Sequence, residues 1–218
     1  MVIFFDLDGT LIDIQARHYH VYEITCSCFG GDPLPQPIYW RMKRAKKDWS
    51  TILRRSKMYV STNAFLKQFN RRIEEKANLT LDSLFPYSLS TLEHLRDCRY
   101  HLFLVTSRRN QNNTLWQLRV RKLLPLFEKI LITPPDIDGG KASAMKKFST
   151  KNSLVVGDTE EDIHAALSLH LPVLGVLSGI RNLSSLRSEN PTCIKQDIRS
   201  LPSLLRLLSK KTFVFSLQ

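Results

Sequence analysis

The chain has 218 residues, of which 43% are hydrophobic and 24% charged, and its 32 Lys and Arg against 20 Asp and Glu give a net charge of +12. Such a length can bury a substantial core in one domain of ordinary size, with or without a smaller insert, which argues against a disordered chain. No stretch approaches the roughly 18 uninterrupted apolar residues of a membrane span, and the apolar start ends at Asp6, too early for a secretory signal. The four cysteines are too sparse for a disulfide framework. We therefore expect a cytoplasmic protein with reduced thiols and no membrane contact.

The first predicted strand, residues 2–5, ends in Asp6-Leu7-Asp8-Gly9-Thr10-Leu11. Residues two apart in an extended segment project to the same side, so Asp6 and Asp8 would face one crevice and repel each other unless a cation lies there. Mg²⁺ is the natural candidate, because it prefers oxygen ligands and is usually held by one or two carboxylates with water and phosphate. The alternative is a plain strand end followed by an Asp8-Gly9 turn.

A long insert follows the first strand, because the next apolar run begins only at residue 101. Helical patterns lie at residues 17–29, 37–57 and 61–77, and we find no convincing strand among them. We predict a small all-helical domain of residues 15–85, inserted into a core formed by residues 1–14 and 86–218.

The remaining apolar runs lack polar alternation, as is typical of strands that are buried on both faces of a parallel sheet. Leucine, isoleucine and alanine recur at helical spacing between them. The alternation predicts an α/β fold with a doubly wound parallel sheet. We expect its later strands at residues 101–105, 129–132, 153–156 and 172–177.

Further polar residues follow these later strands, at the edge where open parallel sheets bind ligands. Thr106-Ser107 offers hydroxyls and turn amides that suit a phosphate oxygen. Lys141 follows Gly139-Gly140 and opens a helix, where it is either a solvated surface group or a cation that neutralises anionic oxygens.

A second acidic cluster, Gly157-Asp158-Thr159-Glu160-Glu161-Asp162, comes at the end of the strand at 153–156 and the start of a helix. Asp158 duplicates the placement of Asp6, and Asp162 lies one helical turn later, within reach of the same ion directly or through water. We expect Glu160 and Glu161 only to stabilise the helix N-terminus. Carboxylates at two strand ends favour a metal site over a simple turn.

Together these segments resemble the haloacid dehalogenase (HAD) superfamily, whose motifs are Asp-x-Asp-Gly-Thr, a strand-end Ser or Thr, a Lys, and a terminal Gly-Asp-x-x-x-Asp. Each appears here in that order, although Gly140-Lys141-Ala142 departs from the Gly-Lys-Pro form that is often seen. The resemblance covers residues 1–13 and about 86–208 and is greatest for the phosphoglycolate phosphatase-like branch. It implies a Rossmann-like core, with the helical insert as the cap of the family's first type (C1).

The resemblance also implies a role for each matched residue. Asp6 would attack phosphorus and form an aspartyl-phosphate, while Asp8 would protonate the leaving oxygen and then deprotonate the attacking water. Thr106, Ser107 and Lys141 would bind the phosphoryl oxygens. The cofactor would be Mg²⁺, held by Asp6, the main-chain carbonyl of Asp8, Asp158 and Asp162.

The expected cap is strongly basic, with 13 basic and 6 acidic residues between positions 14 and 88. Such a charge run is commonly a solvated face. The alternative is that Arg41, Lys43 or Arg44 lines the entrance and attracts a substrate with negative charge beyond its phosphate. The aromatic residues of this segment either stack on a base or sugar or form its core: Tyr39, Trp40, Trp49 and Tyr59.

We therefore predict a Mg²⁺-dependent phosphatase that acts on a small phosphorylated metabolite. A phosphomutase of the same superfamily stays open, since it would use the same nucleophile but protect its phosphoenzyme from water. An inactive member that binds nucleic acid or protein through its basic surface is a third hypothesis, although we find no nucleic-acid-binding motif. We expect no nucleic-acid partner, and the pattern predicts neither the substrate nor the oligomeric state.

Overall fold

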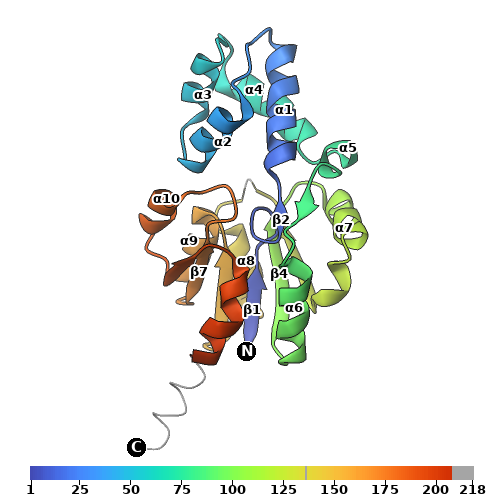
Figure 1. Ribbon diagram of the computed structural model, residues 1–218, viewed down its shortest axis with the longest axis vertical. Coiled ribbons are helices and arrows are strands. Elements are labelled where there is room, and N and C mark those ends of the chain that lie inside the picture. The colour runs from blue at the N-terminus through green and yellow to red at the C-terminus, as the bar shows by residue number, and fades with distance from the viewer. Residues whose placement is uncertain (136, 208–218) are drawn as a thin grey trace, which may run out of the picture.

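Six parallel strands form one sheet in the larger part of the molecule (Figure 1). The structure is a computed structural model that describes residues 1–135 and 137–207. The chain leaves the central strand toward one edge and later returns to fill the other side, which confirms the predicted doubly wound α/β fold. Across the sheet the strands are β5 (Lys129–Thr133), β4 (His101–Ser107), β1 (Val2–Phe5), β6 (Ser153–Gly157), β7 (Val173–Val176) and β8 (Cys193–Lys195).

Both faces of the sheet are buried, which explains why its strands are apolar throughout. Successive residues of a strand point to opposite faces. In β1, Ile3 and Phe5 belong to one buried cluster and Phe4 to the other. The first cluster receives side chains from α6 (Ser88–Asp97), α7 (Gln111–Val120) and the helical residues 201–207, and the second from α8 (Gly140–Lys146), α9 (Glu160–Ser168) and α10 (Leu183–Arg187). Short 3-10 turns lie at Leu124–Leu126 and Ile198–Ser200.

A group of helices stands over the carboxyl ends of the strands, at the end of the sheet opposite the N-terminus (Figure 1). These helices confirm the fold expected for a capped core, and we call them the cap. They are α1 (Gln15–Cys28), α2 (Gln36–Arg44), α3 (Trp49–Arg55), α4 (Thr62–Arg72) and α5 (Lys76–Leu79). Two short antiparallel strands, β2 (Ile12–Asp13) and β3 (Ser83–Leu84), pair where the chain enters and leaves the cap.

The cap differs from the sequence prediction in three details. The pattern at 37–57 is two helices, because Lys46 takes a positive φ of 55° and Asp48 then caps α3 by accepting a hydrogen bond from the Thr51 amide. The pattern at 61–77 also divides, at an extended Glu75. The strand β3 lies within the segment expected to have none. A strand of two residues is too short to produce a recognisable period.

The aromatic side chains of the cap pack mainly against one another. Tyr39 and Trp40 are buried, Tyr39 stacks on Tyr22 with ring centroids 4.1 Å apart, and Trp49 contacts Phe65 at 5.1 Å. Tyr59 is instead fully exposed. Among the described residues, none of the helices is long and apolar enough to cross a lipid bilayer.

Candidate active site

Three adjacent strands, β4, β1 and β6, carry the candidate catalytic residues at their carboxyl ends. Asp6 directly follows β1, Thr106 lies near the end of β4, and Asp158 directly follows β6. Because β1 lies between the other two strands, these side chains converge without any long loop. The chain reverses its direction across the sheet here, which is where open α/β sheets form a binding crevice.

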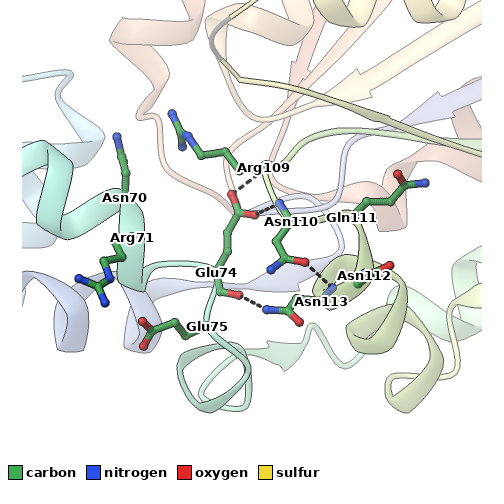
Figure 2. A pocket seen from close by; sticks show the side chains of 9 residues that line it. All are labelled: Asn70, Arg71, Glu74, Glu75, Arg109, Asn110, Gln111, Asn112 and Asn113. Carbon is green, nitrogen blue, oxygen red and sulfur yellow. Dashed lines mark hydrogen bonds between the residues drawn. The ribbon is translucent and has the colours of Figure 1, made fainter.

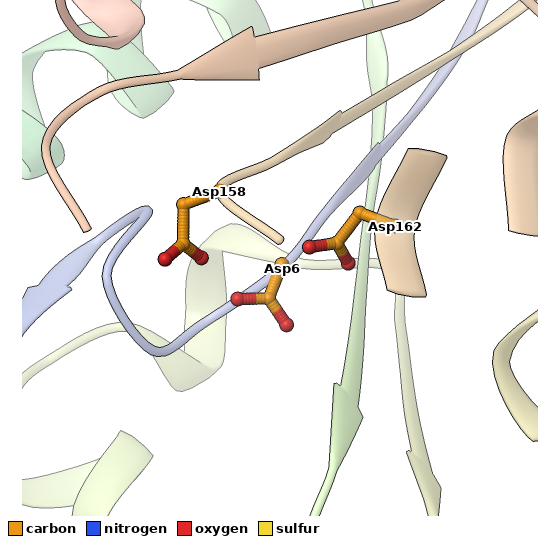
Figure 3. A group of neighbouring side chains, drawn as sticks. All are labelled: Asp6, Asp158 and Asp162. Atoms are coloured by element: carbon orange, nitrogen blue, oxygen red, sulfur yellow. The ribbon is translucent and has the colours of Figure 1, made fainter. Parts of the chain in front are cut away.

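The carboxylates of Asp6, Asp158 and Asp162 form a buried cluster. One oxygen from each lies within 4.8 Å of the others, and the three side chains point toward one another (Figure 3). Their residues are at most 6% exposed. The structure thus brings together the three carboxylates that the sequence assigned to a metal. For Asp8 the expected ligand is the main-chain carbonyl, and its carboxylate lies outside this cluster.

The clustered carboxylates perturb one another. Burial raises the pKa of Asp6 well above its usual range, and the nearby Asp162 and Asp158 carboxylates raise it further, while Lys141 opposes both effects. Burial and Asp162 raise the pKa of Asp158 to about 7. A cation among these oxygens would remove the repulsion, since an opposite charge favours the ionised form.

The shape of the cluster fits a small hard cation. The Asp158 carboxylate accepts a 2.6 Å hydrogen bond from the Ile180 amide and a 3.3 Å bond from the Thr10 hydroxyl, so its orientation is fixed. Gly9 and Gly179 enclose it so closely that a Cβ at either position would overlap the Asp158 side chain. Buried, oriented carboxylate oxygens without a soft ligand are the donors that Mg²⁺ prefers.

Lys141 is a buried group of the cluster and not the solvated surface lysine of the alternative interpretation. Its Nζ donates to Asp6 Oδ1 at 2.6 Å and to Asp162 Oδ1 at 2.7 Å. Burial alone would lower the pKa of this ammonium, but Asp162 and Asp6 outweigh it and raise the pKa well above its usual range. The other oxygen of Asp162 accepts hydrogen bonds from the Thr159 amide and hydroxyl, so this carboxylate is held on both sides.

Asp8 lies in a different electrostatic setting. Its Oδ1 is 2.6 Å from Arg108 Nη2 and 3.1 Å from Arg17 Nη2. Burial works to raise the pKa of Asp8, but the two guanidinium groups outweigh burial and lower the pKa below its usual range. Beside it, burial and Arg17 lower the pKa of His18 well below its usual range, so this imidazole is neutral.

A cavity of about 290 Å³ joins these groups. Its lining includes the carboxylates of Asp6 and Asp8, the Lys141 ammonium, and the side chains of Thr106 and Ser107. Thr106 is only 1% exposed, and the Ser107 hydroxyl donates a 2.5 Å hydrogen bond to Glu161. Ser107 is therefore already engaged by an anion, which makes Thr106 the freer hydroxyl for a phosphate oxygen.

The two glutamates at the start of α9 do more than stabilise their own helix. Glu161 accepts from Ser107, and Glu160 accepts two hydrogen bonds from Arg181, at 2.6 and 2.8 Å. Arg181 lies on the loop after β7, residues 177–182, which also supplies the Ile180 amide to Asp158. Sequence reasoning missed this loop because no motif residue marks it.

The basic residues of α2 meet this same loop. Arg44 donates to the main-chain oxygens of Leu177 at 2.8 Å and Arg181 at 3.3 Å, so it ties the cap to the core. The Lys43 ammonium lies 4.3 Å from the centroid of the Trp49 ring, and burial lowers its pKa to about 8. Arg41 lines a separate pocket beside Trp40, with Gln15 and Asn182 among its neighbours.

Comparison with known proteins identifies the family. The model of the haloacid dehalogenase-like hydrolases matches residues 3–176, most of the chain. The chain belongs to this family. Phosphoglycolate phosphatase of Synechococcus elongatus is 27% identical over 197 residues, which cover 87% of this chain and 89% of that protein. The expected family and the expected class of enzyme, a phosphatase, are confirmed.

Solved structures confirm the fold. A predicted phosphoglycolate phosphatase from Haemophilus somnus superposes with a TM-score of 0.75 at 22% identity, covering 94% of this chain and 97% of that one. A putative beta-phosphoglucomutase from Thermotoga maritima superposes with a TM-score of 0.66 at 17% identity, covering 94% and 98%.

Proposed function

We propose that this protein is a Mg²⁺-dependent phosphatase that hydrolyses a small phosphorylated metabolite through an aspartyl-phosphate on Asp6. The observation that carries this proposal is the buried cluster of Asp6, Asp158 and Asp162 with Lys141 in hydrogen-bond contact. Its cavity of about 290 Å³ is at the small end of ligand pockets, which favours a compact substrate.

The nucleophile is Asp6, because its carboxylate lies on the strand end that faces the cavity. Attack on phosphorus forms the aspartyl-phosphate and releases the substrate oxygen, and water then cleaves the intermediate. Lys141 and Thr106 bind the oxygens of the transferred group and balance their charge. Asp8 lines the cavity beside them and acts on protons. Arg108 and Arg17 favour its ionised form, so the proton that it donates to the leaving oxygen is first taken up from the bound substrate, and Asp8 later accepts one from water.

Asp6, Asp158 and Asp162 would hold the metal, together with the main-chain carbonyl of Asp8. When bound, Mg²⁺ supplies positive charge that offsets repulsion between the nucleophile and the phosphate dianion. The Lys141 ammonium, which contacts Asp6 and Asp162, would add a second positive charge beside the transferred group.

Phosphoglycolate is the first substrate to test, given the relative from Synechococcus elongatus. A phosphomutase is the second candidate, favoured by the fold shared with the Thermotoga maritima protein. Release of inorganic phosphate against formation of a phosphate isomer separates the two. An inactive binding module is less consistent with the site, because each motif position carries a group able to do its chemistry.

The decisive variant is Asp6→Asn, which keeps the shape of the side chain and removes the nucleophile. Hydrolysis of p-nitrophenyl phosphate with Mg²⁺ should fall by at least ~10³-fold, while the melting temperature should not fall. Asp32→Asn is the matched control, since the Asp32 carboxylate pairs with Lys57 on the surface of the cap. If Asp6→Asn keeps the wild-type rate, Asp6 is not the nucleophile and the proposal fails.

We take residues 15–85 as the cap domain and residues 1–14 with 86–218 as the catalytic domain. The cytoplasm is the expected compartment, and the expected partner is the phosphorylated substrate without nucleic acid or membrane. Within the expected cap, the contacts of Arg44 favour a role in seating the cap over a role in attracting substrate.

A further inference from the structure

Two buried arginines hold the same oxygen of Asp8. Arg17 and Arg108 are 1% and 4% exposed. Arg108 Nη2 donates a 2.6 Å hydrogen bond to Oδ1, and Arg17 Nη2 lies 3.1 Å from the same oxygen as an ion-pair partner without a hydrogen bond. Within the described residues we find no hydrogen bond to Oδ2. The Asp8 side chain is 25% exposed and lines the cavity. Oδ2 is therefore the oxygen available to a substrate, and the two arginines determine where it points.

The first arginine belongs to the cap. Arg17 lies in the first turn of α1, where the chain enters the cap, and its Nε donates to Asp82 Oδ1 at 3.0 Å. Asp82 directly precedes β3, where the chain leaves the cap. Arg17 also donates to the main-chain oxygen of Ile73 at 3.2 Å. The ion pair to Asp8 thus joins the catalytic edge of the sheet to both crossings between cap and core.

The second arginine belongs to the core, but the cap holds its loop. Arg108 follows β4, and the next two amides, of Arg109 and Asn110, donate to the Glu74 carboxylate at 3.0 and 2.7 Å (Figure 2). Glu74 follows α4 of the cap and is only 7% exposed. The Asn113 side chain donates to the main-chain oxygen of Glu74 at 2.8 Å, which is a third hydrogen bond between Glu74 and the segment after β4 (Figure 2).

Arg17 and Arg108 are also linked to each other through Asp82 and Gln117. Gln117 of α7 accepts a 3.3 Å hydrogen bond from Arg108 Nη2 and donates one of 2.7 Å to Asp82 Oδ2. Arg17, Asp82, Gln117 and Arg108 therefore form a closed chain of polar contacts that begins and ends at Asp8. Because each group in this chain contacts the next, a shift of the cap segment that carries Asp82 is passed to both arginines at Asp8.

We propose that Arg17 is a positioning residue for Asp8, which couples the seating of the cap to the orientation of the proton-transferring carboxylate. This inference rests on the proposed function. Proton transfer requires a heavy-atom distance of about 2.6–3.2 Å, so a small rotation of Asp8 removes it from reach. Only a cap seated on the core keeps Arg17 on Asp8 Oδ1 and turns Oδ2 toward the leaving oxygen.

The alternative is that this network only stabilises the fold. The two roles differ in how they depend on the leaving group. Nitrophenolate is a stable anion and leaves without a proton, whereas an alkoxide needs one at the moment of bond cleavage. A variant that misplaces Asp8 must therefore slow an alkyl phosphate more than p-nitrophenyl phosphate, while a loss of folded enzyme slows both equally.

The experiment measures kcat of Arg17→Met with p-nitrophenyl phosphate and with an alkyl phosphate that the wild-type enzyme hydrolyses. We expect the alkyl phosphate to lose ~10-fold to 100-fold more than the aryl phosphate, since general acid catalysis contributes ~10²–10⁴-fold. Arg17→Lys, which keeps the charge, should recover part of this difference. Because the result is a ratio within one preparation, it does not depend on the fraction of active enzyme.

Arg121→Met is the matched control. Arg121 also bonds to the segment that leaves the cap, by donating to the main-chain oxygens of Asp82 and Thr80. Within the described part of the chain, its hydrogen bonds do not include Asp8. The ratio of the kcat values of Arg121→Met for the alkyl and the aryl phosphate should equal that of the wild type. If Arg17→Met does not fold, Glu74→Gln provides the same comparison through Arg108.

The proposal is overturned if Arg17→Met slows both substrates by one factor, or if Arg121→Met changes the ratio as much. A wild-type enzyme that hydrolyses no phosphate ester at all would instead contradict the proposed function itself.

Discussion

Gly179→Ala tests the geometry of the carboxylate cluster without replacing Asp6, Asp158 or Asp162. Gly179 lies on the loop after β7 and packs against Asp158, which is 0% exposed. A Cβ at this position would lie 2.7 Å from the Asp158 Cβ and would overlap its Cγ and Oδ2. The methyl group must move about 1 Å from Oδ2 to reach 3.0 Å, the limit below which real Cβ contacts are essentially never found. The substitution therefore displaces the carboxylate or the loop.

The size of the effect follows from this displacement. Misplacing a catalytic group by about 1 Å costs on the order of 10²-fold in rate, and overpacking a core costs about 1–3 kcal/mol of stability. We expect the Mg²⁺ concentration for half-maximal hydrolysis of p-nitrophenyl phosphate to rise at least ~10-fold. At saturating Mg²⁺, kcat should fall by ~10–100-fold, and the melting temperature should fall by ~2–12 °C.

Gly175→Ala is the matched control. Gly175 lies on β7, and a Cβ there would meet its nearest atoms at 3.5–3.7 Å, which is ordinary van der Waals contact. Its Mg²⁺ dependence should equal that of the wild type. If Gly179→Ala and Gly175→Ala have the same half-maximal Mg²⁺ concentration, then Mg²⁺ binding does not need the present position of Asp158.

Two further predictions concern charge at the site. Lys141→Met removes the ammonium that contacts Asp6 and Asp162, and kcat with saturating Mg²⁺ should fall by ~10²–10³-fold; a fall of less than 10-fold would assign Lys141 a structural role. The pKa of Asp158 is raised to about 7 in the fold against about 3.9 in the unfolded chain, so the folded state binds its proton more tightly. The contribution of Asp158 to the stability of the metal-free protein is therefore present below about pH 4 and is lost as the pH rises through 7. Thermal melts of wild type and Asp158→Asn should show that the variant loses less stability between pH 5 and pH 8, and that Mg²⁺ raises the wild-type melting temperature more at pH 8. Equal pH dependence in the two proteins would contradict this assignment.

The fold was largely predictable because its strands are buried on both faces. Each expected run coincides with a strand within two residues at either end, since uninterrupted apolar sequence between helices has few other solutions. The strand β8 was missed because it has only three residues at the edge of the sheet. The divided cap helices were missed because their breaks contain no glycine or proline and depend on single backbone conformations at Lys46 and Glu75.

The candidate site was predictable only where its residues directly follow strands. Asp6 and Asp158 could be associated from the sequence alone, because the ends of parallel strands share one edge. The contact of Arg108 with Asp8 joins residues 100 positions apart, and that of Arg17 with Asp82 spans 65. Such contacts depend on how the cap packs on the core, which no local pattern contains. Arg108 had one usable signal, its place directly after Thr106-Ser107.

If Asp6 attacks phosphorus, the protein must carry the phosphoryl group on Asp6 during turnover. Enzyme turning over p-nitrophenyl phosphate with Mg²⁺ is quenched in acid, digested, and analysed by mass spectrometry. We expect one phosphoryl group on Asp6, absent when Mg²⁺ is omitted and absent in Asp6→Asn. A phosphoryl group on another residue, or steady turnover with none on Asp6, would contradict attack by Asp6.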